Sequence, residues 1–211
     1  MRFKTMLVAA LLALVAVAGA LALWFGQGPN PADFADLREP RITRMNDQRM
    51  LVVEATGDPN VVGADAFKLL FGTYFKLDGV SRAAGTPAPR ARWPRPLDTP
   101  KAAWLGQYAL PVPTGAALPA PPAGTLRVTI ATWVYGDVAE ILHVGPYNAE
   151  QADTERLLHF VAERGYRVVG DHEEEYVKGP GMFFAGDPAK YLTIIRLRVE
   201  RGTGNQPGAG T

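Results

Sequence analysis

The sequence predicts an α+β domain in which two similar units each follow the order strand, helix, strand, strand. Three observations predict this fold: apolar and β-branched runs of strand length, two helical apolar patterns, and the return of the same order in the second half of the chain. Two such units usually join their strands into one mostly antiparallel sheet with both helices on one face. We expect the domain at residues 41–200, as repeats 41–135 and 136–200.

The first repeat opens with a β-branched run at residues 50–55, which predicts a strand. The following turn offers Asp58 as a helix N-cap and Pro59 at the first helical position. Apolar residues at helical spacing then predict a helix to about Leu77. The remaining expected segments are a long loop at 78–101, a strand at 104–112, a Pro-rich loop at 111–124 and a strand at 125–135.

The second repeat begins with a predicted strand at residues 138–145. Asn148, with Gln151 three residues later, has the spacing of a capping box and predicts the start of a helix. Leu158 and Val161 are expected to form the apolar stripe of this helix, and Gly165 its stop. The two remaining strands are expected at 166–177 and 191–199.

Residues 1–29 are predicted to form a signal anchor or a signal peptide. Residues 6–25 carry no charge and are long enough, at roughly 20 residues, to cross a ~30 Å hydrocarbon layer as a transmembrane helix. Arg2 and Lys4 precede this stretch, so the N-terminus is expected in the cytoplasm and the domain outside it, in the periplasm or the extracellular space. The alternative is cleavage at a small-x-small site near Ala20, which would make the protein secreted.

Two further segments are expected to be irregular. Residues 30–40 are polar and contain prolines, which is typical of a tether, and residues 201–211 form a Gly-rich tail that has little to bury and is expected to be disordered. The uncharged stretch at 6–25 makes the membrane an expected partner, through the N-terminal helix. The sequence does not identify a protein partner.

Composition excludes several function classes. Without Arg2 and Lys4, the 22 basic side chains of the 211-residue chain fall to 20, against 21 acidic ones, so we expect no nucleic acid as partner. The chain has no cysteine, which excludes disulfides, thiolate metal sites and cysteine nucleophiles. No Gly-rich phosphate loop or nucleophile elbow appears, and no cofactor is expected.

An unusual acidic triplet occurs in the strand expected at 166–177. In strand geometry His172, Glu174 and Tyr176 share one face, while Glu173 and Glu175 point to the other. One arrangement places the flanking pair in water and turns Glu174 toward a cavity beside Tyr176, where burial would raise the pKa of the carboxyl or a cationic ligand would stabilise it. The alternative is an exposed acidic edge that blocks strand pairing.

Aromatic residues cluster in sequence around the junction of the two repeats. Indole and phenol rings line clefts for flat or cationic molecules, although such residues are more often part of the core. Trp133 and Tyr135 share a face with polar residues, which makes them candidates for a cleft, whereas Trp104 and Tyr108 share a face with Leu110. The sequence-based candidates for ligand binding are Glu174, Tyr176, Tyr147, Trp133, Tyr135 and Trp93.

No metal site is expected. His172 and Glu174 are two ligand types on one strand face, but two ligands do not make a site and a third at useful spacing is missing.

The motifs of residues 136–199 resemble the GyrI-like small-molecule-binding domain, which is also the effector-binding domain of multidrug-responsive regulators. The resemblance rests on Gly136–Glu140, Ile141–Tyr147 with its His-x-Gly-Pro-Tyr turn, Gly165-Tyr166, the His172–Tyr176 strand and Thr193–Arg196. The first repeat is similar at Gly57-Asp58-Pro59, Arg92-Trp93-Pro94 and Ala109-Leu110-Pro111, so the resemblance covers about 160 residues in all. It implies pseudo-twofold symmetry between the repeats, a ligand cleft between them, and a strand glutamate, matching Glu174, that projects into this cleft.

The resemblance implies a binding module as the leading function. A membrane-anchored domain would capture hydrophobic, aromatic or cationic small molecules in the cleft, with Glu174 as buried counter-charge. The alternative is a hydrolase of strained-ring (cyclopropanoid) toxic molecules, because some members of the family resemble such enzymes; Glu174 would then be the general acid or base and Tyr176 would orient the substrate. The sequence does not separate the two, since both need the same carboxylate. A third reading is a structural partner of another envelope protein.

Overall fold

The computed structural model describes residues 29–80, 86–96, 98–118, 126–180 and 186–202. The chain divides into two units, Met1–Phe34 and Ala35–Thr211, and the second contains the whole sheet and both α-helices. The strands are β1 Arg41–Met45, β2 Gln48–Thr56, β3 Arg90–Trp93, β4 Leu105–Pro111, β5 Val128–Trp133, β6 Gly136–Val144, β7 Tyr166–Lys178 and β8 Leu192–Arg201. The helices are α2 Pro59–Tyr74 and α3 Gln151–Glu163, with 3₁₀ turns η1 Pro31–Leu37, η3 Lys101–Ala103, η4 Tyr147–Ala149 and η5 Pro188–Lys190.

The strands form one antiparallel sheet, in the order β1-β6-β8-β7-β3-β4-β2-β5. The order is symmetric about the β7–β3 pair, because β6, β8 and β7 on one side match β2, β4 and β3 on the other. Each repeat therefore runs strand, helix, strand, strand, as β2-α2-β3-β4 and β6-α3-β7-β8. The predicted α+β fold and its antiparallel sheet are confirmed.

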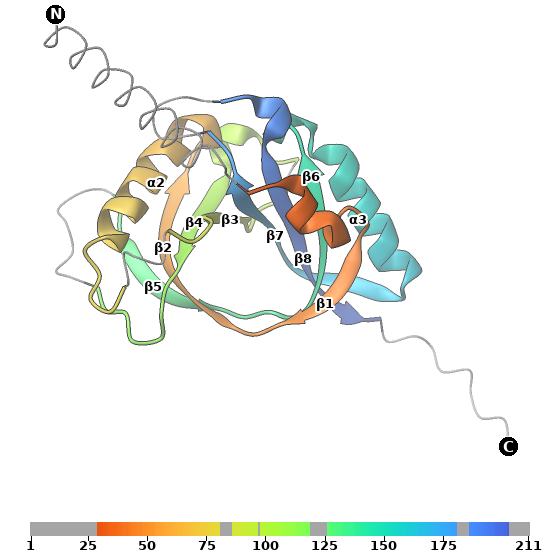
Figure 1. Ribbon diagram of the computed structural model, residues 1–211, viewed down its shortest axis with the longest axis horizontal. Coiled ribbons are helices and arrows are strands. Elements are labelled where there is room, and N and C mark those ends of the chain that lie inside the picture. Colours follow the sequence, from red (N-terminus) through yellow and green to blue (C-terminus); the bar gives the residue numbers. More distant parts are fainter. Residues whose placement is uncertain (1–28, 81–85, 97, 119–125, 181–185, 203–211) are drawn as a thin grey trace, which may run out of the picture. The chain divides into compact units, whose positions relative to one another are not determined.

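The outer strands are exchanged between the repeats. β1 pairs with β6, and β5 pairs with β2, so the two ends of the sheet belong to one long ribbon in which β1–β2 runs against β5–β6 (Figure 1). The register does not change along this ribbon, since Arg41 faces Glu140 and Gln48 faces Trp133. The strand expected at 125–135 is β5, which forms one edge of the sheet beside β2 and continues into β6 of the second repeat, an arrangement that the repeat pattern alone did not indicate.

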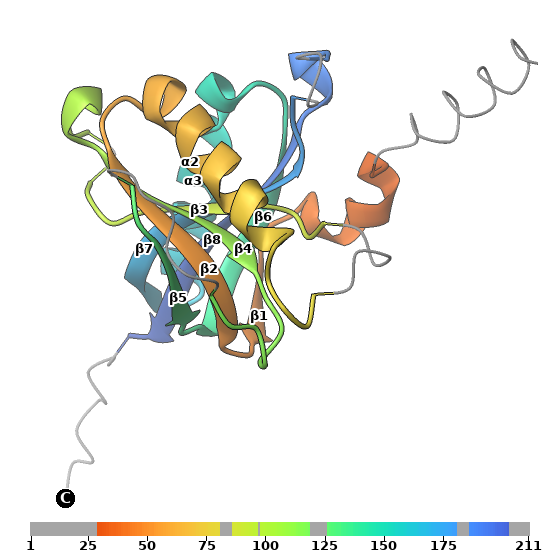
Figure 2. The ribbon, with the colours of Figure 1, turned by 90° about the vertical axis from the view of Figure 1, so that its left-hand side faces the viewer.

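Both helices cover one face of the sheet, as predicted (Figure 2). α2 packs on β2 and β4, and α3 packs on β6 and β7, so the central strands β3 and β7 lie between them. The helix-side core of the first repeat includes Leu51, Leu70 and Leu110, all fully buried. A second core lies under α3, around Ile141 and Leu157.

Two local predictions about the helices need correction. Asn148 does not cap α3, because residues 147–149 form the 3₁₀ turn η4 and Glu150 occupies the N-cap position without a side-chain capping bond. Leu157, not Leu158, lies in the core: Leu158 is 43% exposed while Leu157 is fully buried. The start of α2 is as predicted, since Asp58 accepts a hydrogen bond from the Asn60 backbone amide and Pro59 follows it.

Strand β3 lies inside the long loop expected at 78–101. It is only four residues long, Arg-Ala-Arg-Trp, too short for a periodic signal, yet it bridges the repeats by pairing with both β4 and β7.

Within the described part of the chain, no helix has the length and apolar character needed to span a membrane. The segment expected to do so, residues 6–25, lies outside the described residues.

Candidate ligand-binding site

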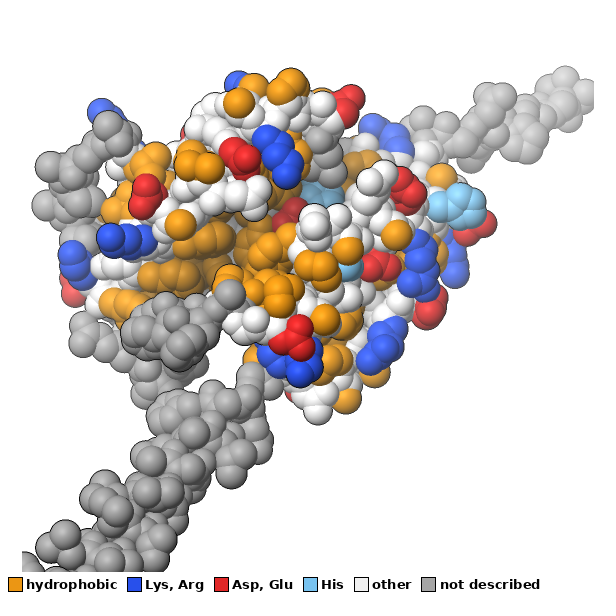
Figure 3. Space-filling model, turned by 90° about the horizontal axis from the view of Figure 1, so that it is seen from above, with side chains coloured by type: hydrophobic (Ala, Val, Ile, Leu, Met, Phe, Trp, Pro, Cys, Tyr) orange, Lys and Arg blue, Asp and Glu red, His pale blue; other side chains and the backbone are white. Residues whose placement is uncertain are grey.

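The candidate site lies on the helix-side face, above β3 and β7 and between α2 and α3. Figure 3 shows a hollow on this face in which hydrophobic side chains gather, with acidic and histidine side chains at its inner end. Strand alternation places His172, Glu174 and Tyr176 of β7 here, because Glu174 pairs with Ala91 and Ile195, two residues of the helix-side cores. The predicted inward orientation of Glu174 is therefore confirmed.

The Glu174 carboxylate is held by three donors. Its Oε1 accepts a 2.7 Å hydrogen bond from Trp93 Nε1, and its Oε2 accepts one of 2.7 Å from the Tyr176 hydroxyl. His172 Nε2 lies 3.3 Å from Oε1. Burial raises the pKa of the Glu174 carboxyl, but the hydrogen bonds and charge of His172, with those from Tyr176 and Trp93, outweigh it and lower the pKa. The side chain, 12% exposed, is thus a fixed, buried negative charge.

Aromatic rings surround this carboxylate. Tyr176 makes edge contacts with Phe67 and Tyr147, at ring-centroid distances of 5.9 and 5.4 Å. Trp93 contacts Trp104 and Tyr108 at 5.2 and 5.8 Å. Burial, with the charge of Glu174 next, raises the pKa of Tyr108 to about 12. The pKa of Tyr147 is also raised, chiefly by burial. These phenols stay neutral at physiological pH and form a polarisable wall.

Tyr147 is the accessible member of this wall. It is 39% exposed, and its ring lies between Tyr176 and Tyr191, each at a centroid distance of 5.4 Å. The Gly-Pro-Tyr turn after β6 carries it, because Gly145 adopts a positive φ of 146° that a side chain would disfavour. Of the six candidates from sequence, Glu174, Tyr176, Tyr147 and Trp93 lie together here.

Trp133 and Tyr135 do not join them. Both lie on the opposite face of the sheet, in a buried cluster with Met50 and Val138, and their expected place in the cleft is wrong. The Tyr135 hydroxyl donates a 2.9 Å hydrogen bond to Glu173 Oε1. Strand alternation places Trp133 on one face with Thr129, as expected, but this more polar face lies with Met50 and Val52 on the side of the sheet away from the helices.

On that opposite face, acidic side chains that were expected to face solvent form a buried charge network with arginines. Glu173, expected in solvent with Glu175, is 2% exposed and contacts three arginines. These contacts are Arg92 Nε at 2.8 Å, Arg196 Nη1 at 3.6 Å and Arg90 Nη1 at 3.7 Å. Burial lowers the pKa of Arg196, but the charges of Glu175 and Glu140 outweigh it and raise the pKa.

A cavity of about 340 Å³ adjoins this network, and Arg92, Glu173 and Arg196 line it. Arg92 and Arg196 both lie within ion-pair distance of Glu173, so we assign this cavity to the network and not to ligand capture.

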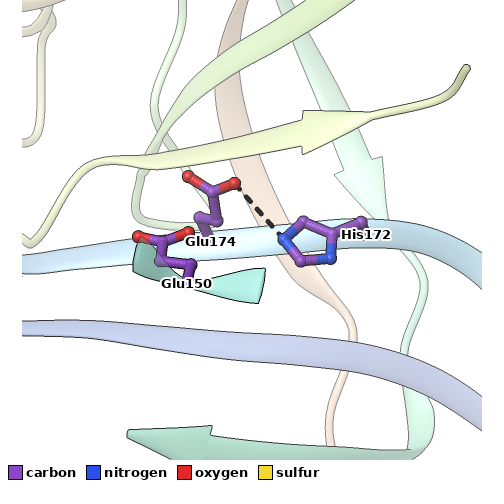
Figure 4. A group of neighbouring side chains, drawn as sticks. All are labelled: Glu150, His172 and Glu174. Carbon is purple, nitrogen blue, oxygen red and sulfur yellow. Dashed lines mark ion pairs between the residues drawn. The ribbon is translucent and has the colours of Figure 1, made fainter. Parts of the chain in front are cut away.

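Sequence reasoning missed Glu150. This side chain is 7% exposed, and its Oε1 has no hydrogen-bond partner among the described residues. Figure 4 shows its carboxylate beside that of Glu174, with His172 next to them, and one ligand atom of each residue lies within 4.8 Å of the others. Burial, with the nearby charge of Glu174 next, raises the pKa of Glu150 to about 9. Glu150 has no periodic signal because it lies between a 3₁₀ turn and a helix.

The wall of the site leaves no room for a methyl group at Gly106 of β4. A Cβ there would lie 2.7 Å from the Tyr108 ring and 2.9 Å from Trp93 Cζ3. We expect Gly106→Ala to lower the free energy of unfolding by about 1–3 kcal/mol, since overpacking displaces both rings. Gly72→Ala in α2, where a Cβ meets nothing within 4 Å, is the control and should raise stability by about 0.4–1 kcal/mol. Urea denaturation followed by circular dichroism measures both; equal effects of the two substitutions would contradict the close packing at Gly106.

The fold is shared with solved structures of other proteins. A hydrolase from Listeria innocua matches with a TM-score of 0.63 and 21% sequence identity, over 81% of this chain and 96% of its own. An uncharacterised conserved protein from Listeria innocua matches with a TM-score of 0.63 and 22% identity, over 81% and 97% of the two chains. The EcmrR C-terminal domain matches with a TM-score of 0.55 and 12% identity, over 77% and 98%.

No family model matches the sequence, and no curated protein matches it. The structural matches support the fold that the GyrI-like resemblance implies. The chain therefore shares one fold with the Listeria innocua hydrolase and the EcmrR C-terminal domain.

Proposed function

We propose that this protein is a GyrI-like domain that binds hydrophobic cationic or aromatic small molecules at Glu174. The observation that carries the proposal is a buried carboxylate, fixed by Trp93 and Tyr176 and surrounded by aromatic rings. A lipophilic cation satisfies both parts of this site, because its charge compensates the carboxylate and its apolar groups contact the rings. A neutral ligand would cover Glu174 without compensating its charge.

We propose that a ligand reaches Glu174 past Tyr147. This ring contacts Tyr176 and is itself 39% exposed, so its side chain is expected to be displaced first. The displaced phenol would then lie against the ligand as part of the wall of the site.

The direct test is a fluorescence titration of the full-length chain with tetraphenylphosphonium. The indole of Trp93 donates to the carboxylate that receives the cation, so saturable quenching is expected. Triphenylphosphine oxide, which is similar in shape but neutral, is the matched control and should bind at least about tenfold more weakly. Equal affinity for the two molecules would contradict charge selection by Glu174.

Hydrolysis is the second candidate function. One support is the orientation of Glu174, because Trp93 and Tyr176 fix its two oxygens as a general base requires. The other is that one protein of the same fold is described as a hydrolase. Turnover of a cyclopropane electrophile by the wild-type chain, abolished in Glu174→Gln with an unchanged circular dichroism spectrum, would establish this function. Saturable binding without turnover would leave capture as the function.

We also propose that residues 1–29 anchor the domain to a membrane and that the domain is exported. The support is the uncharged stretch at 6–25 and the preceding Arg2 and Lys4. Fractionation of cells that express the full chain should recover it with membranes, and external protease should digest the domain. Recovery in the cytoplasmic fraction would contradict the proposal.

A further inference from the structure

We infer that Glu150, His172 and Glu174 form a three-ligand site for a divalent transition-metal ion such as Zn²⁺. The inference shares Glu174 with the proposed function but goes beyond it, because it assigns Glu150 and His172 and a different class of ligand. His172 and Glu174 alone give only two ligands on one strand face. The fold adds the third by bringing the N-cap residue of α3 against β7.

The first support is convergence. One potential ligand atom from each of the three side chains lies within 4.8 Å of the others, and they come from two elements of the second repeat, β7 and the start of α3 (Figure 4). Ligands of an ion bound at about 2.0–2.2 Å lie roughly 3–4 Å apart, so small side-chain rotations would close the site.

The second support is an unsatisfied atom. Glu150 is only 7% exposed, and its Oε1 has no hydrogen-bond partner in the described part of the chain. A buried oxygen without a partner costs free energy, which a bound cation would recover. Packing alone does not explain why a glutamate is buried against a second carboxylate.

The third support is the orientation of the shared ligand. Metal-binding carboxylates are usually held by outer hydrogen bonds, and Trp93 and Tyr176 supply them to Glu174. His172 lacks the corresponding support, because its Nδ1 has no partner among the residues described. Loss of such a partner typically weakens a metal site about 10- to 100-fold, so we expect micromolar rather than nanomolar affinity.

The donor set selects the ion. One imidazole and two carboxylates carry two negative charges together once Glu150 has released its proton to the solvent on metal binding, and these charges neutralise a divalent cation. Imidazole suits Zn²⁺ and its neighbours in the transition series, whereas Ca²⁺ requires six to eight oxygen ligands and Mg²⁺ a near-octahedral set. Three protein ligands leave a fourth position of a zinc ion open to water or to a ligand in the hollow.

The test is calorimetric titration of the metal-free, untagged full-length chain with Zn²⁺, with Mg²⁺ and Ca²⁺ as comparison ions. We expect one Zn²⁺ per chain, and affinity at least about tenfold lower in both Glu150→Gln and His172→Gln. The control is His159→Gln on α3, where an exposed histidine lies 3.5 Å from Glu163, and it should change nothing. Titration with Co²⁺ gives a second readout, since its visible absorption reports the coordination of the ion.

Tetraphenylphosphonium binding separates this inference from the proposed function. Glu150→Gln should still bind the organic cation, which also shows that the variant is folded, while losing Zn²⁺. Zn²⁺ affinity unchanged in Glu150→Gln and His172→Gln, or equal affinity for Mg²⁺, would overturn the metal site and leave cation capture at Glu174 standing. If the wild-type chain does not bind tetraphenylphosphonium, that result would instead count against the proposed function alone.

Discussion

Glu174→Gln is expected to weaken tetraphenylphosphonium binding by at least about 30-fold. Removing one partner of a buried, hydrogen-bonded charge pair costs about 2–5 kcal/mol, of which the lower limit corresponds to this factor. The glutamine keeps the size of the side chain and an oxygen that accepts from Trp93 or Tyr176, so the walls of the site stay in place. What the variant loses is the negative charge that the cation needs.

Two comparisons show that the loss is one of charge recognition. Triphenylphosphine oxide should bind Glu174→Gln at least as well as wild type, because in the wild type it covers a carboxylate whose charge it does not compensate. Glu163→Gln, which removes an exposed carboxylate on α3, should leave the affinity for tetraphenylphosphonium within about twofold. If Glu174→Gln bound the cation as well as wild type does, the rings alone would be responsible for binding.

The parts of this fold that the sequence predicted are those with a local signal. The apolar runs at β2, β4 and β8 and the Asp58-Pro59 start of α2 agree with the structure because their residues determine their own backbone. Alternation along β7 correctly placed Glu174 inward with Tyr176, since strand geometry fixes which side chains share a face.

The parts that it missed depend on distant contacts. β3 is a strand because β4 and β7 pair with it on both sides, and no four-residue pattern indicates that. Trp133 lies on the far face because the register of β5 with β2 places it on the side of Met50 and Val52, and there Arg92 stacks over its ring at 4.0 Å. Glu150 comes close to Glu174 and His172 only through the docking of α3 on the sheet. Sequence could therefore identify the central carboxylate and the nearby rings of Trp93 and Tyr147, but not Glu150.

The Glu173 network gives the largest expected effect on stability. Glu173→Gln should lower the free energy of unfolding by about 3–5 kcal/mol, because it leaves Arg90, Arg92 and Arg196 with one buried carboxylate fewer. The arginines cannot lose their charge at ordinary pH, and β3, β7 and β8 hold them in place, so the unbalanced charge stays buried. Urea denaturation of the full-length chain measures this loss.

Glu200→Gln is the matched control, since it removes a carboxylate paired with an arginine across the same two strands, β7 and β8. Arg167 lies 2.9 Å from Glu200, but the two side chains are 61% and 55% exposed. Exposed pairs contribute about 0–1 kcal/mol, so this variant should unfold almost as wild type does. Because both substitutions replace a glutamate by a glutamine, the difference between them measures the burial of Glu173 together with its additional arginine contacts. Similar losses from both variants would mean that the Glu173 network is hydrated. The face of the sheet opposite the helices would then not depend on this network for stability.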